Sequence, residues 1–477
     1  MKDLCKNFVD GRFIDNDGGT IEVHNPANHE LLGSVPDSSP AVIDLAVEAA
    51  RRAQPAWERL PAIERANHLK AISAKLRQSR DSLAEIITRE QGKVLPLARV
   101  EVDFTAEYMD YMADWARRLE GEVITSDKAG ESIFLLRKPL GVTAGILPWN
   151  FPLFLIARKM APALVTGNTI VVKPSEETPL NAFAFAKLVS ETSLPAGVFN
   201  LVSGTGASAG AALSGHPNVN LVSFTGSVET GLRIMQAAAK NLTRVNLELG
   251  GKAPVIVLAD ADLDMTAKAI YDSRMVNTGQ LCNCAERVYV QRAVKDALVE
   301  RLAKLMRNTR YGDPMREADL DMGPLINEAS VAKIGAMVDR ARADGAEVVT
   351  GGKPAQIPGF HYEPTVLTNC RSDMEIMRKE IFGPVLPIQA VDSLEEAIDL
   401  ANDSEYGLTS SVFTRDLNSA LRAVRDLRFG ETYINREHFE AMQGFHAGRR
   451  KSGIGGADGK HGLYEYTETH IVYIQMH

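Results

Sequence analysis

The chain has 477 residues, of which 45% are hydrophobic and 24% charged, and its formal net charge is −8. This composition is typical of a globular protein, and the length predicts two or three domains because it exceeds what one hydrophobic core supports. The mild acidic excess argues against a nucleic-acid-binding surface. No apolar run reaches signal-peptide or bilayer length, so we expect a cytoplasmic protein with no membrane partner.

Residues 35–120 are predicted to be helical, because apolar residues recur there at helical spacing. Residues 121–139 have the pattern of a hairpin around a Lys-Ala-Gly turn. Such a hairpin would be exposed unless something covered it, so it is a candidate oligomer contact. The tail HIVYIQMH (470–477) alternates like a strand, whose partner would be the hairpin or a neighbouring subunit.

Short apolar runs alternate with helix-like segments in the rest of the chain, first over 141–249 and again over 254–435. Strands that alternate with helices predict doubly wound parallel sheets, here in two α/β units. Ligands bind beyond the carboxyl ends of such strands.

The four cysteines, Cys5, Cys282, Cys284 and Cys370, are predicted to be reduced thiols. A chain of this length does not depend on disulfides, and Cys282 and Cys284 are too close to bridge comfortably in an extended segment. These two also lack the neighbouring ligands of a zinc site, so we expect no metal.

Three residues suggest nucleophilic chemistry. Cys282 lies in the glycine-containing loop VNTGQLCNCAER, where a rigid scaffold can hold a reactive thiol. Glu248 ends a strand before two glycines, and Asn150 lies between two prolines, where its amide could stabilise an oxyanion. Taken singly, these residues could also be an inert buried thiol, an exposed turn acid and a turn-forming asparagine.

Two further segments suit a nucleotide. KPSE follows a strand, and its Lys173 and Ser175 suit a phosphate or ribose, whereas Glu176 suits ribose hydroxyls and repels a 2′-phosphate. FTGS contains Gly226 and Ser227 at a strand-to-helix turn that could cradle a pyrophosphate. The generic G-x-G-x-x-G fingerprint is absent from this turn, so each segment is a weak signal alone.

The segments LPWNFP, KPSE, FTGS, LELGGK, N-x-G-Q-x-C and EIFGPVL occur in this order, and together they resemble the aldehyde dehydrogenase superfamily over nearly the whole chain. The resemblance implies that the Cys282 thiolate attacks an aldehyde to give a thiohemiacetal. The Cys282 backbone N–H and the Asn150 amide would form the oxyanion hole, and hydride would pass to a nicotinamide. Glu248 would then activate the water that hydrolyses the thioester, and Lys159 would tune the charge nearby or simply be solvated.

The same resemblance implies the cofactor contacts. Lys173 and Glu176 would hold the adenosine ribose, Glu380 and Lys333 the nicotinamide ribose, and Phe382 would contact the nicotinamide side. The other expected cofactor contacts are Leu147, Trp149, Ser175, Gly226 and Ser227. Glu176 favours NAD, although NADP is possible if Glu176 swings away and Ser175 accepts the phosphate.

The predicted fold is α/β, with a Rossmann-like NAD-binding domain over 1–120 and 140–250 and a second α/β catalytic domain over 251–450. The segments 121–139 and 461–477 would form an oligomerisation unit. Relatives form dimers or tetramers in this way, so the resemblance implies a homo-oligomer, and the sequence does not choose between the two.

The stretches IARKMAPAL, GQLCNCAERVYVQ and the polar C-terminal segment resemble the lactaldehyde and glycolaldehyde dehydrogenase branch. In that branch a small hydroxyaldehyde would be the substrate, and Arg158, Asn283, Glu440 and His446 would meet its hydroxyl or carbonyl. Arg158 could instead form a structural salt bridge, and His446 could be a surface or packing residue.

Succinate semialdehyde or another ω-semialdehyde is the alternative substrate, because Arg449 and Arg450 could add positive charge near the mouth of the site.

Many relatives also carry a glutamate near the C-terminal S-G-x-G motif. This chain has Ala457 and Asp458 there, so either Asp458 replaces that acid or the proton leaves through water. Two other classes of protein compete with this interpretation. The segments KPSE and FTGS argue against a simple cysteine hydrolase, and the retained Cys282 and Glu248 argue against a non-catalytic protein.

Overall fold

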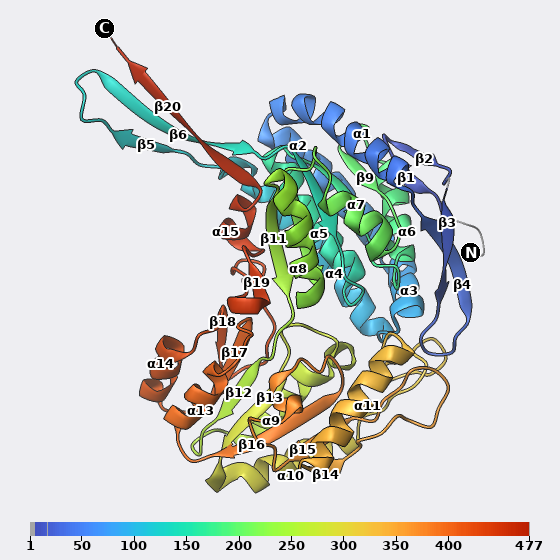
Figure 1. Cartoon of the computed structure of the whole chain (residues 1–477), viewed down its shortest axis with the longest axis vertical. Coiled ribbons are helices and arrows are strands. Elements are labelled where there is room, and N and C mark those ends of the chain that lie inside the picture. Colours follow the sequence, from blue (N-terminus) through green and yellow to red (C-terminus); the bar gives the residue numbers. More distant parts are fainter. Residues whose placement is uncertain (1–4, 17, 477) are drawn as a thin grey trace.

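The computed structural model describes residues 5–16 and 18–476, and it contains two α/β blocks and a projecting three-stranded arm (Figure 1). Each block is built around one large sheet, and the site lies where the two blocks face each other. Within the described residues, no helix combines the length and apolar character needed to cross a membrane.

The first block contains an eight-stranded sheet of order β19-β11-β10-β7-β8-β9-β1-β2. The five central strands are parallel to one another, and both edges are antiparallel. The predicted apolar runs form these central strands, whose residues are nearly all buried, as expected for a sheet covered on both faces. The strands are β1 (Asn7–Val9), β2 (Arg12–Ile14), β7 (Val142–Ile146), β8 (Thr169–Lys173), β9 (Phe199–Leu201), β10 (Leu221–Gly226), β11 (Arg244–Leu249) and β19 (Gly453–Ile454).

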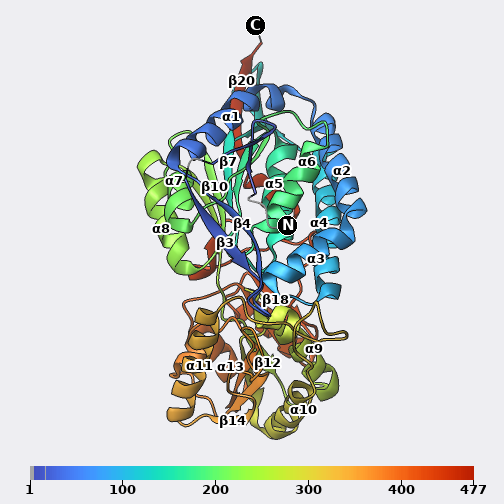
Figure 2. The ribbon, with the colours of Figure 1, turned by 90° about the vertical axis from the view of Figure 1, so that its right-hand side faces the viewer.

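Helices cover both faces of this sheet (Figure 2). One face packs against α1 (Pro40–Arg59), α7 (Ala211–Ser214) and α8 (Val228–Ala238). The other packs against α2 (Ala62–Gln78), α3 (Arg80–Gln91), α4 (Leu95–Ala113), α5 (Pro152–Thr166) and α6 (Leu180–Ser190). Every residue of α5 is buried, so this helix carries its polar side chains into the interior of the protein.

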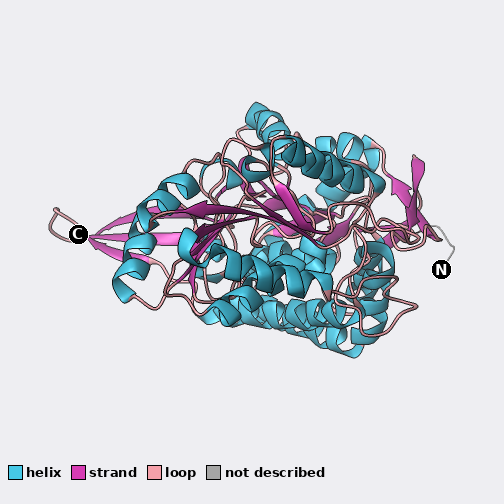
Figure 3. Ribbon diagram, turned by 90° about the horizontal axis from the view of Figure 1, so that it is seen from below, coloured by secondary structure: helices cyan, strands magenta, loops and turns pink. Residues whose placement is uncertain are grey.

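The second block contains a seven-stranded sheet of order β14-β15-β16-β13-β12-β17-β18, parallel except for β14. Seen from below, its strands lie between two layers of helices (Figure 3). The strands are β12 (Pro254–Val257), β13 (Arg287–Gln291), β14 (Glu347–Thr350), β15 (Thr365–Thr368), β16 (Val385–Val391), β17 (Thr409–Phe413) and β18 (Glu431–Ile434). The helices are α9 (Leu263–Met275), α10 (Lys295–Arg307), α11 (Glu328–Ala343), α12 (Glu375–Arg378), α13 (Leu394–Asn402) and α14 (Leu417–Asp426).

The arm joins the predicted hairpin to the C-terminal tail (Figure 1). The hairpin strands are β5 (Glu122–Thr125) and β6 (Glu131–Pro139), and α15 (Gly459–Tyr464) leads into the tail strand β20 (Thr467–Gln475). β20 pairs antiparallel with β6 along its whole length, from Thr467 opposite Pro139 to Gln475 opposite Glu131. Of the two partners expected for the tail, the strand therefore pairs with the hairpin of its own chain.

Two N-terminal hairpins were not predicted. β1 and β2 are joined by Asp10 and Gly11, whose φ values of 53° and 74° fit a two-residue hairpin turn. The Asp-Gly pair was the available signal for this hairpin. β3 (Gly19–His24) and β4 (Leu31–Asp37) form the second hairpin, so the helical region begins at Pro40.

Candidate active site

Cys282 follows a tight turn at the end of α9. Asn277 and Thr278 adopt left-handed backbone with φ of 49° and 61°, which is unfavourable for residues other than glycine and persists only when the surroundings hold it. The Asn277 amide donates to the Asn150 carbonyl at 3.1 Å, and the Thr278 hydroxyl donates to the Gly323 carbonyl at 3.0 Å. Both blocks thus fix the loop that presents the thiol.

Two cavities meet at Cys282. The larger has a volume of about 230 Å³ and lies between the carboxyl ends of β10 and β11 and the turn 380–382. The smaller has a volume of about 60 Å³ and lies against α4, α5 and residues 439–440. Asn150, Thr225 and Cys282 line both. A thiol in this position can react with a small molecule in one cavity while a second molecule occupies the other.

Glu248 lies at the carboxyl end of β11 and is only 5% exposed, so the exposed turn acid considered from the sequence is wrong. It accepts a hydrogen bond from the Thr225 hydroxyl at 3.3 Å, and the Arg158 guanidinium lies 3.6 Å away. Burial alone would raise the pKa of this carboxyl, but Lys159 and Arg158 outweigh burial and lower it. Glu248 is therefore ionised, as a general base must be.

Lys159 is fully buried, so the solvated alternative for this residue is also wrong. Its ammonium donates to the hydroxyls of Ser223 at 3.1 Å and Thr225 at 2.9 Å. Burial lowers the pKa of Lys159 to about 8, although the nearby Glu248 carboxylate opposes that shift. The hydroxyl of Thr225 links the lysine to the carboxylate.

Asn150 lies just before α5 and is held in place by residues that the sequence did not reveal. Its side-chain amide donates to the Gln280 carbonyl at 2.9 Å, and its own carbonyl accepts from the Lys93 ammonium at 2.8 Å. Lys93 is paired with Glu101 at 2.6 Å, and both side chains are fully buried. Glu101 also accepts from two backbone N–H groups in the first turn of α5. Lys93 lies in the loop between α3 and α4 and Glu101 lies on α4, and charged residues in such positions are usually solvated, so the sequence pattern did not indicate this pair.

The larger cavity contains most of the expected cofactor contacts. Trp149 and Phe382 meet edge to face with ring centroids 5.5 Å apart. Glu380 accepts from the Gly251 N–H at 2.7 Å, and burial, aided by Glu286, raises its pKa to about 7 although Lys333 opposes the rise. The remaining expected residues on its wall are Gly226 and Ser227.

Four expected cofactor residues lie outside this cavity. Lys173 ends β8 and pairs with Glu176 at 2.9 Å, while Glu176 also accepts from the Gly206 N–H at 3.3 Å. Ser175 lies between them, and Leu147 is buried just beyond the end of β7. The hydroxyl of Ser227 accepts from the Thr230 N–H and so caps the N-terminus of α8.

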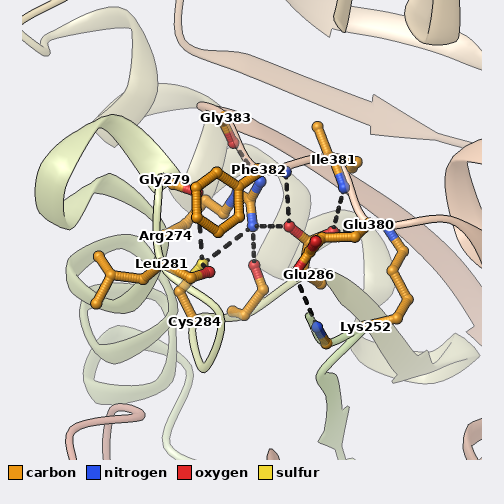
Figure 4. A network of polar contacts seen from close by, with 12 residues as sticks. Lys252, Arg274, Gly279, Leu281, Cys284, Glu286, Glu380, Ile381, Phe382 and Gly383 are labelled. Carbon is orange, nitrogen blue, oxygen red and sulfur yellow. Dashed lines mark hydrogen bonds and ion pairs between the residues drawn. The ribbon is translucent and has the colours of Figure 1, made fainter. Parts of the chain in front are cut away.

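Glu286 holds the turn that carries Glu380 and Phe382 (Figure 4). Its carboxylate accepts from the N–H groups of Ile381 at 2.9 Å and Phe382 at 3.1 Å, and from Lys252 at 2.7 Å and Arg274 at 2.8 Å. Burial opposes ionisation, but Arg274 and Lys252 lower the pKa of Glu286 to about 2.

Arg274 extends this contact to the nucleophile loop, because it donates to the Cys284 sulfur at 3.2 Å and to the Ala285 carbonyl at 2.9 Å (Figure 4). A single buried network therefore joins the larger cavity to the loop that carries Cys282. Neither Arg274 nor Glu286 was expected from the sequence.

Arg158 is buried on α5, and carboxylates of the chain surround its guanidinium. Nε donates to Asp458 Oδ1 at 3.0 Å, and Nη2 donates to Asp458 Oδ2 and lies 3.3 Å from Glu440 Oε1. With Glu248, three carboxylates pair with one arginine. The pairing partner that the sequence left open is thus the protein itself, and the arginine needs no acidic substrate to neutralise it.

Asp458 is 2% exposed, and Arg158 contacts both it and Glu248. The acid that the sequence offered in place of the usual glutamate therefore belongs to the same buried ion-pair cluster as Glu248.

Asn283 and Glu440 form the polar wall of the smaller cavity, together with Arg158. The Asn283 amide donates to Glu440 Oε2, while Asn283 Oδ1 is buried and has no hydrogen-bond partner among the described residues. The apolar wall consists of Phe104, Phe151, Phe154, Leu155, Leu281 and Phe439.

His446 lines neither cavity. It is 1% exposed, so the surface histidine considered from the sequence is wrong, and its Nδ1 lies 2.5 Å from Glu431 Oε1. Arg449 and Arg450 are exposed and line neither cavity, so the expected positive charge at the mouth of the site is not provided by them.

The sequence matches the model of the aldehyde dehydrogenase family over residues 13–472, and the chain belongs to this family. Its members oxidise aldehydes with NAD or NADP through a thiohemiacetal on a cysteine.

Among individual proteins, the chain is 58% identical to lactaldehyde dehydrogenase from Escherichia coli over 469 residues, which are 98% of each chain. It is 38% identical over 470 residues to the NADP-dependent succinate-semialdehyde dehydrogenase of the same organism, covering 98% of this chain and 97% of the relative. A crystal structure of lactaldehyde dehydrogenase from Escherichia coli matches with a TM-score of 0.99 at 57% identity and covers 100% of both chains.

The Glu286 network predicts a linked loss of stability and cofactor affinity. Glu286→Gln leaves Lys252 and Arg274 buried with one carboxylate fewer, so we expect the free energy of unfolding to fall by about 3–5 kcal/mol. The turn 380–382 also loses its anchor, so the dissociation constant for NAD should rise. Urea unfolding and calorimetric titration measure the two effects, and Glu375→Gln at an exposed ion pair is the control. Unchanged values for both would contradict this role.

Proposed function

We propose that the protein oxidises a small neutral hydroxyaldehyde, of the lactaldehyde or glycolaldehyde type, to its acid with NAD. The observation that carries the substrate assignment is the polar wall of the smaller cavity, where the Glu440 carboxylate accepts from Asn283 and from Arg158. A carboxylate oxygen can accept more than one hydrogen bond, so a substrate hydroxyl can donate to the same group.

Cys282 is the nucleophile in this proposal. Its thiolate attacks the aldehyde carbon, and its own N–H and the Asn150 amide stabilise the resulting oxyanion. A nicotinamide held in the larger cavity by Trp149, Glu380 and Phe382 would supply the acceptor for the hydride that leaves the aldehyde carbon. Glu248 then takes a proton from the water that attacks the thioester, and the acid leaves as Cys282 regains its electron pair. Lys159 and Arg158 keep Glu248 ionised for this step.

The size and charge of the smaller cavity support a short, uncharged substrate. Its volume is about 60 Å³, and aromatic side chains enclose it. Glu440 would repel the free carboxylate of an ω-semialdehyde, and Arg158 is already paired with Asp458, Glu440 and Glu248. The high identity to a lactaldehyde dehydrogenase supports the same substrate class. Succinate semialdehyde is the weaker candidate, although a more distant relative bears that name.

NAD is the proposed cofactor in preference to NADP. Lys173 and the Gly206 N–H hold the Glu176 carboxylate beyond the end of β8. Burial alone would raise the pKa of this carboxyl, but Lys173 and the backbone hydrogen bonds outweigh burial and lower it. An ionised carboxylate accepts hydrogen bonds from ribose hydroxyls and repels a 2′-phosphate.

The same proposal includes a cofactor domain over 1–120 and 140–250, a catalytic domain over 251–450, and an oligomerisation unit over 121–139 and 461–477. A homo-oligomer would form through the arm. Val123 on β5 is 77% exposed and Tyr473 on β20 is 63% exposed, so the arm presents apolar surface that a second copy of the chain can cover.

Substrate preference tests the roles of the polar wall of the smaller cavity and of the paired Arg158. The wild-type enzyme should show a higher kcat/KM for lactaldehyde than for succinate semialdehyde, measured by NADH formation. Asp458→Asn should release the Arg158 charge and raise the ratio of succinate semialdehyde to lactaldehyde kcat/KM by about tenfold. Glu468→Gln on the exposed arm is the control. A wild-type preference for the semialdehyde would refute the proposed substrate.

Cofactor preference tests the role of Glu176. Replacing Glu176 by Gln removes the negative charge and keeps the size, so the ratio of NADP to NAD kcat/KM should rise about tenfold. Glu177→Gln at the next position is the matched control. If the ratio is unchanged in Glu176→Gln, another residue sets the preference.

A further inference from the structure

Residues 90–93, with the sequence EQGK, form a buried polar segment at the end of α3 and in the loop that follows. The three polar side chains of this segment are at most 1% exposed. Gly92 has a φ of 88°, and a Cβ there would lie 2.5 Å from Pro324, so the chain turns in close contact with the second block. This turn leads the chain to Lys93, whose side chain lies in the interior beside the site.

The ammonium of Lys93 contacts the loop that carries Asn150. It donates to Glu101 Oε2 at 2.6 Å and to the Asn150 carbonyl at 2.8 Å, and it lies 3.5 Å from the centre of the Phe151 ring. The other carboxylate oxygen of Glu101 accepts from two N–H groups in the first turn of α5, at 2.9 and 3.1 Å. The pair therefore holds the backbone from Asn150 to the beginning of α5.

Asn150 is joined to the nucleophile loop through both its backbone and its side chain. Its carbonyl accepts from the Asn277 amide at 3.1 Å, and its own amide donates to the Gln280 carbonyl at 2.9 Å. An asparagine amide has two N–H groups, so one of them remains for an oxyanion. Asn150 and Cys282 line the same two cavities, so the position of that donor relative to the sulfur depends on how the Asn150 backbone is held.

The contacts of the pair favour a positioning role over a contribution to stability alone. A buried ion pair is a weak source of stability, because the desolvation of the two charges offsets much of their attraction. Among the described residues, the hydrogen bonds that Lys93 Nζ and the Glu101 carboxylate make beyond each other all go to the backbone of residues 150–154. The two charges are therefore directed at the segment that carries the oxyanion donor.

We propose that Lys93 and Glu101 are positioning residues, which act through Asn150 on the formation of the thiohemiacetal. The inference rests on the proposed roles of Cys282 and Asn150. As the sulfur electron pair forms the bond to the aldehyde carbon, the carbonyl electron pair moves to oxygen, and the remaining Asn150 N–H donates to that oxygen. Neither Lys93 nor Glu101 lines a cavity at Cys282, so the loss of the pair should affect this step and leave cofactor affinity unchanged.

The rate of the first turnover tests the proposal on the whole enzyme, measured as NADH formation after rapid mixing with saturating NAD and glycolaldehyde. Lys93→Met/Glu101→Gln removes both charges and nearly keeps the side-chain sizes, and the glutamine oxygen can still accept from α5. The rate should fall about tenfold, because small displacements of a catalytic group have effects of this size or larger. The dissociation constant for NAD, from calorimetric titration, should equal that of the wild type. Glu101→Gln alone should slow the first turnover in the same direction and tests the pair if the double variant does not fold.

A mutant cycle with Asn150→Ala separates a positioning role from a purely structural one. If the pair acts through Asn150, adding Lys93→Met/Glu101→Gln to Asn150→Ala should cause no further fall in the first-turnover rate. The matched control is Lys75→Met/Glu191→Gln at an ion pair of 2.9 Å on the surface, and it should keep the wild-type rate.

Two results would overturn the inference. One is a wild-type first-turnover rate in the variants of Lys93 and Glu101. The other is an equal fall in that rate with and without the Asn150 side chain, which would mean that the pair does not act through Asn150. If Cys282→Ala still forms NADH, the proposed function fails instead.

Discussion

The buried guanidinium of Arg158 is the constraint on which the substrate side of this molecule depends. A charge that is only 4% exposed inside a protein must be paired, and here the three partners come from two parts of the chain that are distant in sequence from Arg158. Asp458 and Glu440 belong to the C-terminal segment, whereas Glu248 ends a strand of the first sheet. Pairing Arg158 therefore brings Glu248, the polar wall of the smaller cavity and the C-terminal segment to one place.

The same principle organises the other side of Cys282. Lys93 with Glu101, and Lys252 and Arg274 with Glu286, are buried ion pairs whose remaining bonds go to backbone groups near the reacting atoms. The first pair fixes Asn150 and the start of α5, and the second fixes the turn 380–382. Separating either group of charges would leave a buried charge without a partner, which is costly. The ion pairs therefore hold the backbone near Asn150 and the turn 380–382 in place.

The sequence predicted the features that depend on local patterns. Alternating apolar runs indicated the two parallel sheets, and the ordered motifs indicated the family and the residues around both cavities. Buried polar networks were not predictable in this way. Lys93 in a loop and Glu101 on α4 look like ordinary solvated charges in the sequence. Arg158 meets Asp458 across 300 positions of sequence, so only the fold reveals that pair. The surface or solvated alternatives for Glu248, Lys159 and His446 failed for the same reason, because the partners that allow their burial are distant in sequence.

The central claim is that Cys282 carries the acyl group and Glu248 releases it. The most direct measurement is the mass of Glu248→Gln enzyme after incubation with NAD and glycolaldehyde, followed by peptide mapping. The account predicts a trapped acyl group on Cys282, together with one equivalent of NADH and little further turnover. An adduct on a different residue, or full turnover without any adduct, would contradict it.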